Sequence, residues 1–162
     1  MHKDLIAIKL GKKLKQWVVE SLRSSLVYAM QSGNTLCISS KFSEINWSED
    51  FNTDAFPTKE IFNFEEWQRY INYMKIVKES ENKNMNGDTG LYGRVADFKM
   101  VLLHSFHNEA VMERIIESVG DNIKHFRVLI IEKPEELDLS LHARKAVKEA
   151  GKACFMSEGE RN

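Results

Sequence analysis

Apolar and polar positions follow a regular order over the second half of the chain, from Val95 onward. Short apolar runs, which predict strands, are separated by stretches with the periodicity of an amphipathic helix. In chain order the predicted elements are strand Val95–Phe106, helix Asn108–Val119, strand Phe126–Ile131, helix Glu135–Ala150 and strand Ala153–Met156. Strands that alternate with helices predict a parallel, right-handed α/β layer, so we expect a single three-layer-like α/β domain with a βαβαβ C-terminal half.

The first half of the chain is predicted to be rich in helix and in aromatic residues. Apolar residues recur every four positions from Leu10 to Gln31, which predicts one long amphipathic helix with Gly33 in the left-handed position after its end. Gly11 is the expected break if residues 5–8 form a separate strand instead of the first turn of this helix. The next apolar run, Thr35–Phe42, predicts a strand.

A second helix is expected to begin at Asn63. The Asn63 side chain can cap a helix and Glu66, three residues later, can return the hydrogen bond. Apolar and aromatic residues then follow at helical spacing as far as Val77, so this helix is predicted to be continuous. The stretch Glu79–Gly90 is dense in Asn, Gly and charge, and predicts either a mobile loop or a hairpin that turns at Asn86-Gly87.

Size and composition predict one soluble α/β domain over residues 1–162, with two halves around a single core. Lys plus Arg (23) nearly balances Asp plus Glu (24), and this lacks the basic excess of a dedicated nucleic-acid binder. The two cysteines have neither the spacing of metal ligands nor that of a disulfide framework. The chain has no apolar run of membrane length, and we expect a cytoplasmic protein without a cofactor or metal.

The carboxyl ends of the predicted strands carry the candidate catalytic residues. Ligands of parallel sheets usually bind at these ends, where His104 and His107 flank one strand and Glu132 ends the next. Asp97 and Lys99 point to one face of the first strand and complete this candidate set. No third ligand is identifiable beside the two histidines, so we favour a structural role near the helix cap over a metal site.

Gly87-Asp88 followed by Asp97-Phe98-Lys99 resembles the acidic pair plus lysine of metal-dependent nucleases of the restriction-endonuclease type. The resemblance implies two carboxylates that hold a divalent ion beside a phosphodiester, with the lysine polarising the attacking water. Only eight residues separate the two acids, which leaves little room for the hairpin of that family. An ion pair at the edge of a sheet is the interpretation we prefer.

The order of strands and helices in the C-terminal half is also similar to one half of a phospholipase-D-type domain. The activity of that superfamily rests on a His-x-Lys-x4-Asp motif, which is absent from this sequence, so no site residue carries over. Glycine-rich phosphate loops are absent as well. This argues against a nucleotide-dependent enzyme more strongly than against enzymes in general.

The aromatic residues of the first half are the best indication of a partner. Most must form core, but we expect Tyr73 and one of the loop aromatics Trp47, Phe51 and Phe56 to stay exposed and to contact another protein. A basic helix face could bind nucleic acid, although a solvated face is the more usual role of such lysines. Its residues are Lys9, Lys12, Lys13 and Lys15.

Two functions follow from these observations. The first is a non-catalytic binding or regulatory module that engages another protein. The alternative is a small metal-dependent hydrolase or nuclease that acts on phosphodiesters. The alternative requires that His104, His107, Asp97 and Glu132 converge in one pocket, which the fold can test.

Overall fold

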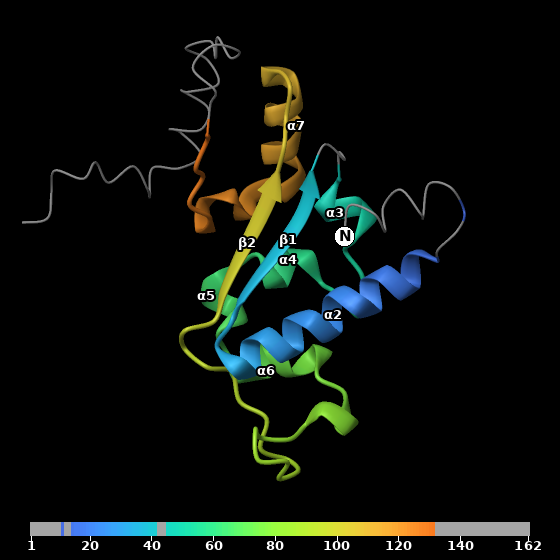
Figure 1. Cartoon of the computed structure of the whole chain (residues 1–162), viewed down its shortest axis with the longest axis vertical. Helices are drawn as coiled ribbons and strands as arrows, with labels where there is room; N and C mark the ends of the chain where they lie inside the picture. The colour runs from blue at the N-terminus through green and yellow to red at the C-terminus, as the bar shows by residue number, and fades with distance from the viewer. Residues whose placement is uncertain (1–10, 12–13, 42–44, 132–162) are drawn as a thin grey trace, which may run out of the picture.

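A computed structural model describes residues 11, 14–41 and 45–131 of the chain. This part mixes helix and strand, as the α/β prediction requires (Figure 1). In chain order its elements are α2 (Lys15–Ser32), β1 (Thr35–Lys41), α3 (Trp47–Asp50), α4 (Thr58–Ile61), α5 (Phe64–Trp67), α6 (Tyr70–Tyr73), the 3-10 turns η1 (Met74–Ile76) and η2 (Glu79–Glu81), β2 (Lys99–His104), α7 (Glu109–Val119) and the 3-10 segment η3 (Gly120–His125).

β1 and β2 lie side by side as a parallel pair, joined by the long connection that carries the short helices (Figure 1). Cys37 pairs with Val101 and Ile38 with Leu102, so the centres of the two predicted strands are confirmed. β2 begins later than predicted, because the amide of Val95 donates to the carbonyl of Met30 in α2 rather than to a strand. The register shifts near the carboxyl end of β1, where Ser40 bulges between Ser39 and Lys41.

The predicted third strand is not confirmed, because no strand is assigned to Phe126–Ile131. Residues of this segment and of the carboxyl end of β2 together line an apolar cavity of about 160 Å³. The aromatic ring of Phe126 packs edge-on against Phe62 at 5.4 Å. Within the described residues β2 pairs with β1 only, so the three-layer βαβαβ arrangement is also unconfirmed. The predicted helix Glu135–Ala150 and strand Ala153–Met156 lie outside the described residues.

The long N-terminal helix is confirmed from Lys15 to Ser32. Its core-facing stripe follows the predicted four-residue spacing through Val18, Leu22, Leu26 and Met30, which are all buried. Gly33 takes the left-handed conformation after the helix, with a φ of 69° and its amide bonded to a carbonyl of the last turn. The helix begins later than the predicted start at Leu10, because Leu14 has an extended backbone (ψ 136°) and an exposed side chain in place of a buried position in the stripe.

The helix predicted from Asn63 to Val77 is wrong beyond its first turn. The Asn63 side chain accepts a hydrogen bond from the amide of Glu66, so the predicted cap is present. The chain leaves the helix at Arg69, whose extended backbone (ψ 133°) separates α5 from α6. The Asn72 side chain donates to the carbonyl of Glu66 across this break at 2.7 Å, which supplies a local alternative to helical hydrogen bonding.

The aromatic residues that were expected to contact a partner are buried instead. Trp47 and Phe56 have no exposed surface, and Phe51 and Tyr73 are also core residues. The connection after β1 packs down on the core, where Trp47 lies 5.6 Å from Phe62, ring centroid to centroid. Rings of this size each bury about 150–250 Å² of surface, so they stabilise the fold when they are buried in the core.

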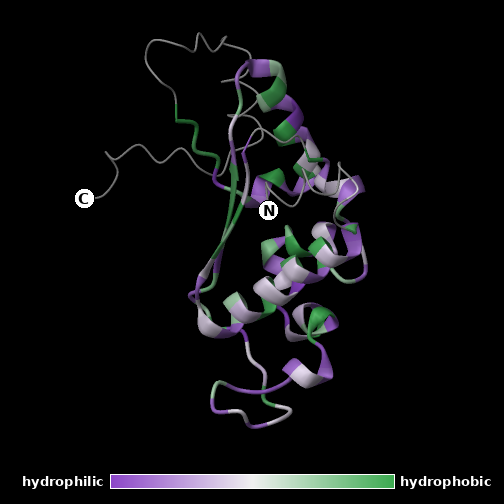
Figure 2. Cartoon of the chain, turned by 45° about the vertical axis from the view of Figure 1, so that its right-hand side comes forward, coloured by the Kyte–Doolittle hydropathy of each residue, from purple (hydrophilic) through white to green (hydrophobic). Residues whose placement is uncertain are grey.

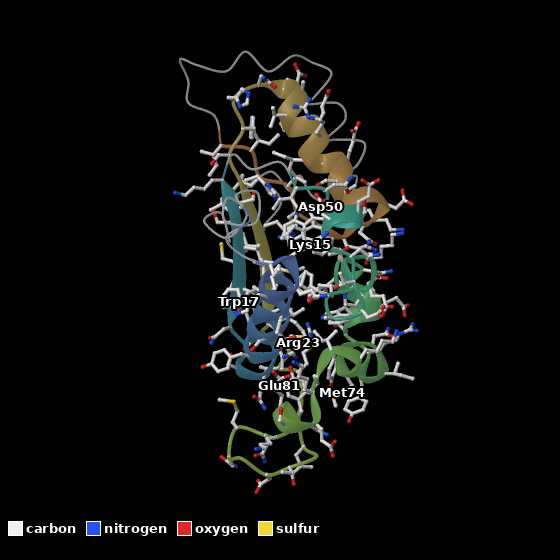
Figure 3. All side chains as sticks on the ribbon, turned by 90° about the vertical axis from the view of Figure 1, so that its right-hand side faces the viewer. Lys15, Trp17, Arg23, Asp50, Met74 and Glu81 are labelled. Carbon is white, nitrogen blue, oxygen red and sulfur yellow. The ribbon has the colours of Figure 1, made fainter. Side chains whose placement is uncertain are left out.

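A buried arginine joins α2 to the turns that precede β2 (Figure 3). The Arg23 side chain is 4% exposed and donates to the carboxylates of Glu20 and Glu81 at 2.6–2.9 Å. It also donates to the carbonyl of Ile76 at 2.7 Å. These hydrogen bonds lower the pKa of Glu20 to about 2 and lower the pKa of Glu81 below its usual range.

The stretch Glu79–Gly90 takes the hairpin form, which was one of its two predicted alternatives. Lys83 and Thr89 form an isolated antiparallel bridge, and Gly87 takes a φ of 93° in the turn between them. The Asn84 side-chain oxygen accepts hydrogen bonds from the amides of Asn86 and Asp88. The base of the hairpin is therefore anchored to α2 through Glu81 and Arg23.

We expect Arg23→Met to lower the free energy of unfolding by about 3 kcal/mol, because it leaves two carboxylates and a carbonyl without their donor. Urea denaturation measures this. Arg69→Met is the matched control, since Arg69 forms an exposed ion pair with Glu66 and its loss should cost less than about 1 kcal/mol. Equal losses in the two variants would contradict the role given to Arg23.

Candidate functional site

The carboxyl ends of β1 and β2 bring a serine and a histidine together. The Ser40 hydroxyl lies 2.5 Å from Nδ1 of His104, and the His104 ring packs edge-on against Trp47 at 6.4 Å. The other ring nitrogen, Nε2, is buried and has no hydrogen-bond partner within the described part of the chain. Burial lowers the pKa of His104, so the imidazole is neutral at pH 7.

A serine beside a histidine is the pair that nucleophilic catalysis requires, but Ser40 does not meet the second requirement. Its side chain has no exposed surface, so a substrate cannot reach the hydroxyl. The contact therefore fixes the orientation of the His104 ring over Trp47. We interpret it as a structural contact at the edge where a ligand would be expected.

The other predicted catalytic residues do not gather around His104. His107 is exposed in the turn before α7, and Glu132 lies outside the described residues. Asp97 and Lys99 lie at the amino end of β2, and the length of the strand puts Lys99 about 17 Å from His104. The described residues contain no group of three or more His, Cys, Asp or Glu side chains placed to hold a metal ion.

Arg94 is the residue with the most unusual environment. Its guanidinium carbon lies 5.2 Å from the centroid of the Phe64 ring and 5.6 Å from that of Phe98. The pKa of Arg94 is lowered, chiefly by burial and against the opposite influence of the Tyr73 and Tyr92 hydroxyls. We call Arg94 and these four aromatic residues the Arg94 cluster.

Arg94 has no counter-ion within the described residues. No carboxylate there lies within ion-pair distance of its guanidinium, and its Nε is buried without a hydrogen-bond partner. Arg23 shows the contrast, because burial of its charge is offset by two carboxylates. Two aromatic rings supply only cation–π attraction to Arg94, about 0.5–2 kcal/mol each, and leave its terminal Nη donors, which unlike Nε are not buried, for another group.

Contacts with α2 and with the core fix the aromatic side chains of the Arg94 cluster. The Tyr92 hydroxyl donates to the carbonyl of Val27 in α2 at 2.7 Å, and burial raises the pKa of Tyr92 above its usual range. Phe98 is a core residue, and the Tyr73 ring lies 6.1 Å from that of Tyr92. A site whose side chains are fixed in this way loses little entropy when a ligand binds.

Arg94 is not among the predicted site residues, because it lies neither at the carboxyl end of a predicted strand nor beside a histidine. The available signal was an arginine in a short segment between Tyr92 and Phe98, after a helix with further aromatic residues. The predicted lysine face is described only at Lys15, whose ammonium lies 5.7 Å from the Phe51 ring. Lys9, Lys12 and Lys13 lie outside the described residues.

Comparison with known proteins gives no independent assignment. No family model, no curated protein and no solved structure matches the chain. Among the described residues, no helix has the length and apolar character needed to span a bilayer. The geometry of the described residues therefore supports the functional argument by itself.

We expect His104 to make the fold acid-sensitive between about pH 7 and about pH 5. Its folded pKa is depressed, so the unfolded chain takes up a proton first, and the stabilisation by neutral His104 is lost as the pH falls through the folded pKa. Glu20 and Glu81 contribute only at lower pH, because their usual pKa of 4.5 lies below this window.

Urea denaturation at the two ends of this pH window tests the expectation. His104→Gln keeps a side chain that can bond Ser40 and cannot titrate, so it should lose less stability on acidification than the unaltered protein. His107→Gln serves as the exposed control and should behave like the unaltered protein. The same acid loss in all three proteins would exclude His104 as its source.

Proposed function

We propose that the protein is a non-catalytic binding module that takes an acidic segment of a partner protein at the Arg94 cluster. The observation that carries this proposal is a half-buried arginine without a counter-ion among the described residues. Partial burial of an unpaired charge is unfavourable, and a carboxylate from a partner would remove the penalty while forming a two-pronged hydrogen bond with the guanidinium.

The surroundings of Arg94 support a protein partner. Tyr70 of α6 is 59% exposed, and its ring packs edge-on against Tyr73 of the cluster at 5.5 Å. Ile71 beside it is also exposed. Arginine and tyrosine are enriched among the residues that carry most of the binding energy at protein interfaces. We infer that these side chains would surround the carboxylate contact with apolar surface.

A nucleic-acid partner receives less support. Phosphate backbones bind through several cations at once, and this chain has a net charge of −1. Lys15, the described member of the predicted lysine face, stacks on a ring of the core. A regulatory role and a cytoplasmic location remain part of the proposal, and the exposed free thiol of Cys37 is in keeping with a reducing compartment.

Titration of the ¹⁵N-labelled protein with an end-capped peptide of alternating Glu and Gly tests the proposal by NMR. We expect saturable shifts in the amides around Arg94 and in its Nε–Hε signal. Arg94→Gln should weaken binding at least about tenfold, since hydrogen bonds to charged groups contribute about 1.5–3 kcal/mol. The affinity of Arg94→Lys should lie between those of the unaltered protein and Arg94→Gln, because an ammonium keeps the charge but lacks the planar arrangement of donors.

Two controls make the result specific. Arg69→Gln alters an exposed, already paired arginine and should leave binding unchanged. A peptide with Lys in place of Glu should not shift the same signals. Unchanged affinity in Arg94→Gln, with a thermal melt that shows a folded protein, would overturn the proposal.

A further inference from the structure

An apolar cavity lies beside the carboxyl end of β2, and we call it the β2 cavity. Its lining comes from β2, from one face of α7 and from the segment that follows η3. Met112, Ile116 and Val119 share that face of α7, because they are separated by four and three residues. Ile130 packs against Met112. Figure 2 shows the hydrophobic residues of α7 and of the segment 128–131 in green.

The β2 cavity has the size of one small ring. Its volume is about 160 Å³, and apolar cavities of about 150 Å³ can take up a molecule such as benzene. Water gains few hydrogen bonds between apolar walls, so a mainly apolar molecule is the better occupant. A single ring or a short branched chain therefore fits this space.

The β2 cavity is also lined by His104, which brings a polar atom to it. Nδ1 of this ring lies 2.5 Å from the hydroxyl oxygen of Ser40 in β1, and β1 pairs along one edge of β2. The two nitrogens of an imidazole point in diverging directions, so Nε2 is turned away from β1 and towards the cavity side of β2. This Nε2 is buried and has no hydrogen-bond partner within the described residues. A buried polar atom without a partner is unfavourable, and a ligand can supply the partner.

We propose that the β2 cavity binds a small hydrophobic molecule with one hydroxyl group, such as a phenol, and that this hydroxyl forms a hydrogen bond with Nε2 of His104. A neutral imidazole has one donor and one acceptor nitrogen, whereas a hydroxyl group can both donate and accept. The hydroxyl therefore fits Nε2 in either tautomer of the ring. The contact with Ser40 keeps the ring in the orientation that this hydrogen bond needs.

The other lining residues favour a hydrophobic ligand over an anion. Leu103 and Leu129 line the cavity and are 51% and 82% exposed, so a bound apolar molecule would remove some of their surface from water. Arg127 also lines it, but this residue is exposed and water solvates its charge. A carboxylate would have to leave water for a place beside a neutral imidazole, which is unfavourable. The Arg94 cluster takes no part, so the proposal does not depend on the proposed function.

Titration of the full-length protein with phenol, benzene and benzoate tests the proposal by NMR. We expect phenol and benzene to shift the methyl signals of Met112 and Ile116 saturably, because both rings fit the cavity. Phenol should move the ¹⁵N signal of Nε2 in His104 much further than benzene does, since only phenol can form the hydrogen bond. Equal Nε2 shifts, or no saturable binding of phenol, would overturn the proposal. Tighter binding of benzoate than of phenol would also overturn it.

The variant His104→Phe removes the polar atom and keeps an apolar ring. It should weaken phenol binding at least about fivefold, which corresponds to the loss of one hydrogen bond. Benzene binding should change less than about twofold, because benzene has no donor or acceptor to lose. His125→Phe is the matched control, since Nε2 of His125 is likewise buried without a partner but His125 does not line the cavity. Equal losses of phenol affinity in the two variants would contradict the role given to His104.

Filling the cavity identifies the place of binding. Ile116→Trp puts a larger side chain into the β2 cavity and should abolish the binding of phenol and of benzene. Glu113→Trp introduces the same residue at an exposed position of α7 outside the lining, and it should leave both affinities unchanged. A thermal melt shows whether each variant is folded, and the Nε2 shift in the unaltered protein decides the question if a variant unfolds. Phenol binding that survives in folded Ile116→Trp would overturn the proposal.

Discussion

The hydrogen-bonded fork of Arg23 is the interaction on which the arrangement of the described chain depends. It joins α2 to Ile76 and Glu81, which lie more than fifty residues further along the chain. The segment after Glu81 then returns through Tyr92 to the carbonyl of Val27, on the same helix. Both attachments hold the connection so that β2 starts beside β1. Helix α2 is therefore the support of the crossover as well as a wall of the core.

Two arginines in this molecule show how partial burial leads to different roles. Arg23 is satisfied by two carboxylates and a carbonyl, so its charge stabilises the fold. Arg94 has aromatic neighbours and no counter-ion among the described residues, so its guanidinium is left to pair with an anionic group of a ligand. The chemistry of the two side chains is the same. What differs is whether the chain supplies the anion, and this is the physical basis of the proposed binding role.

Local patterns predicted local structure well. The stripe of α2, the left-handed Gly33, the Asn63 cap and helix α7 all follow from spacing and from capping chemistry. Prediction failed where tertiary contacts decide: the extended backbone of Arg69 interrupts a helical pattern, and Phe126 packs on Phe62 instead of continuing a sheet. For Arg94 the sequence offered only its place between aromatic residues, because the absence of a nearby carboxylate is not revealed by spacing along the chain.

The pairing of Cys37 with Val101 has a consequence for how the protein is made. The two residues are 64 positions apart (101 − 37), so the sheet closes a long loop and its formation is slow compared with that of α2. At a synthesis rate of about 5–20 residues per second, β1 leaves the ribosome several seconds before β2 exists. During that interval the backbone of β1 has no neighbouring strand, and the nascent chain is exposed to aggregation through this unpaired edge.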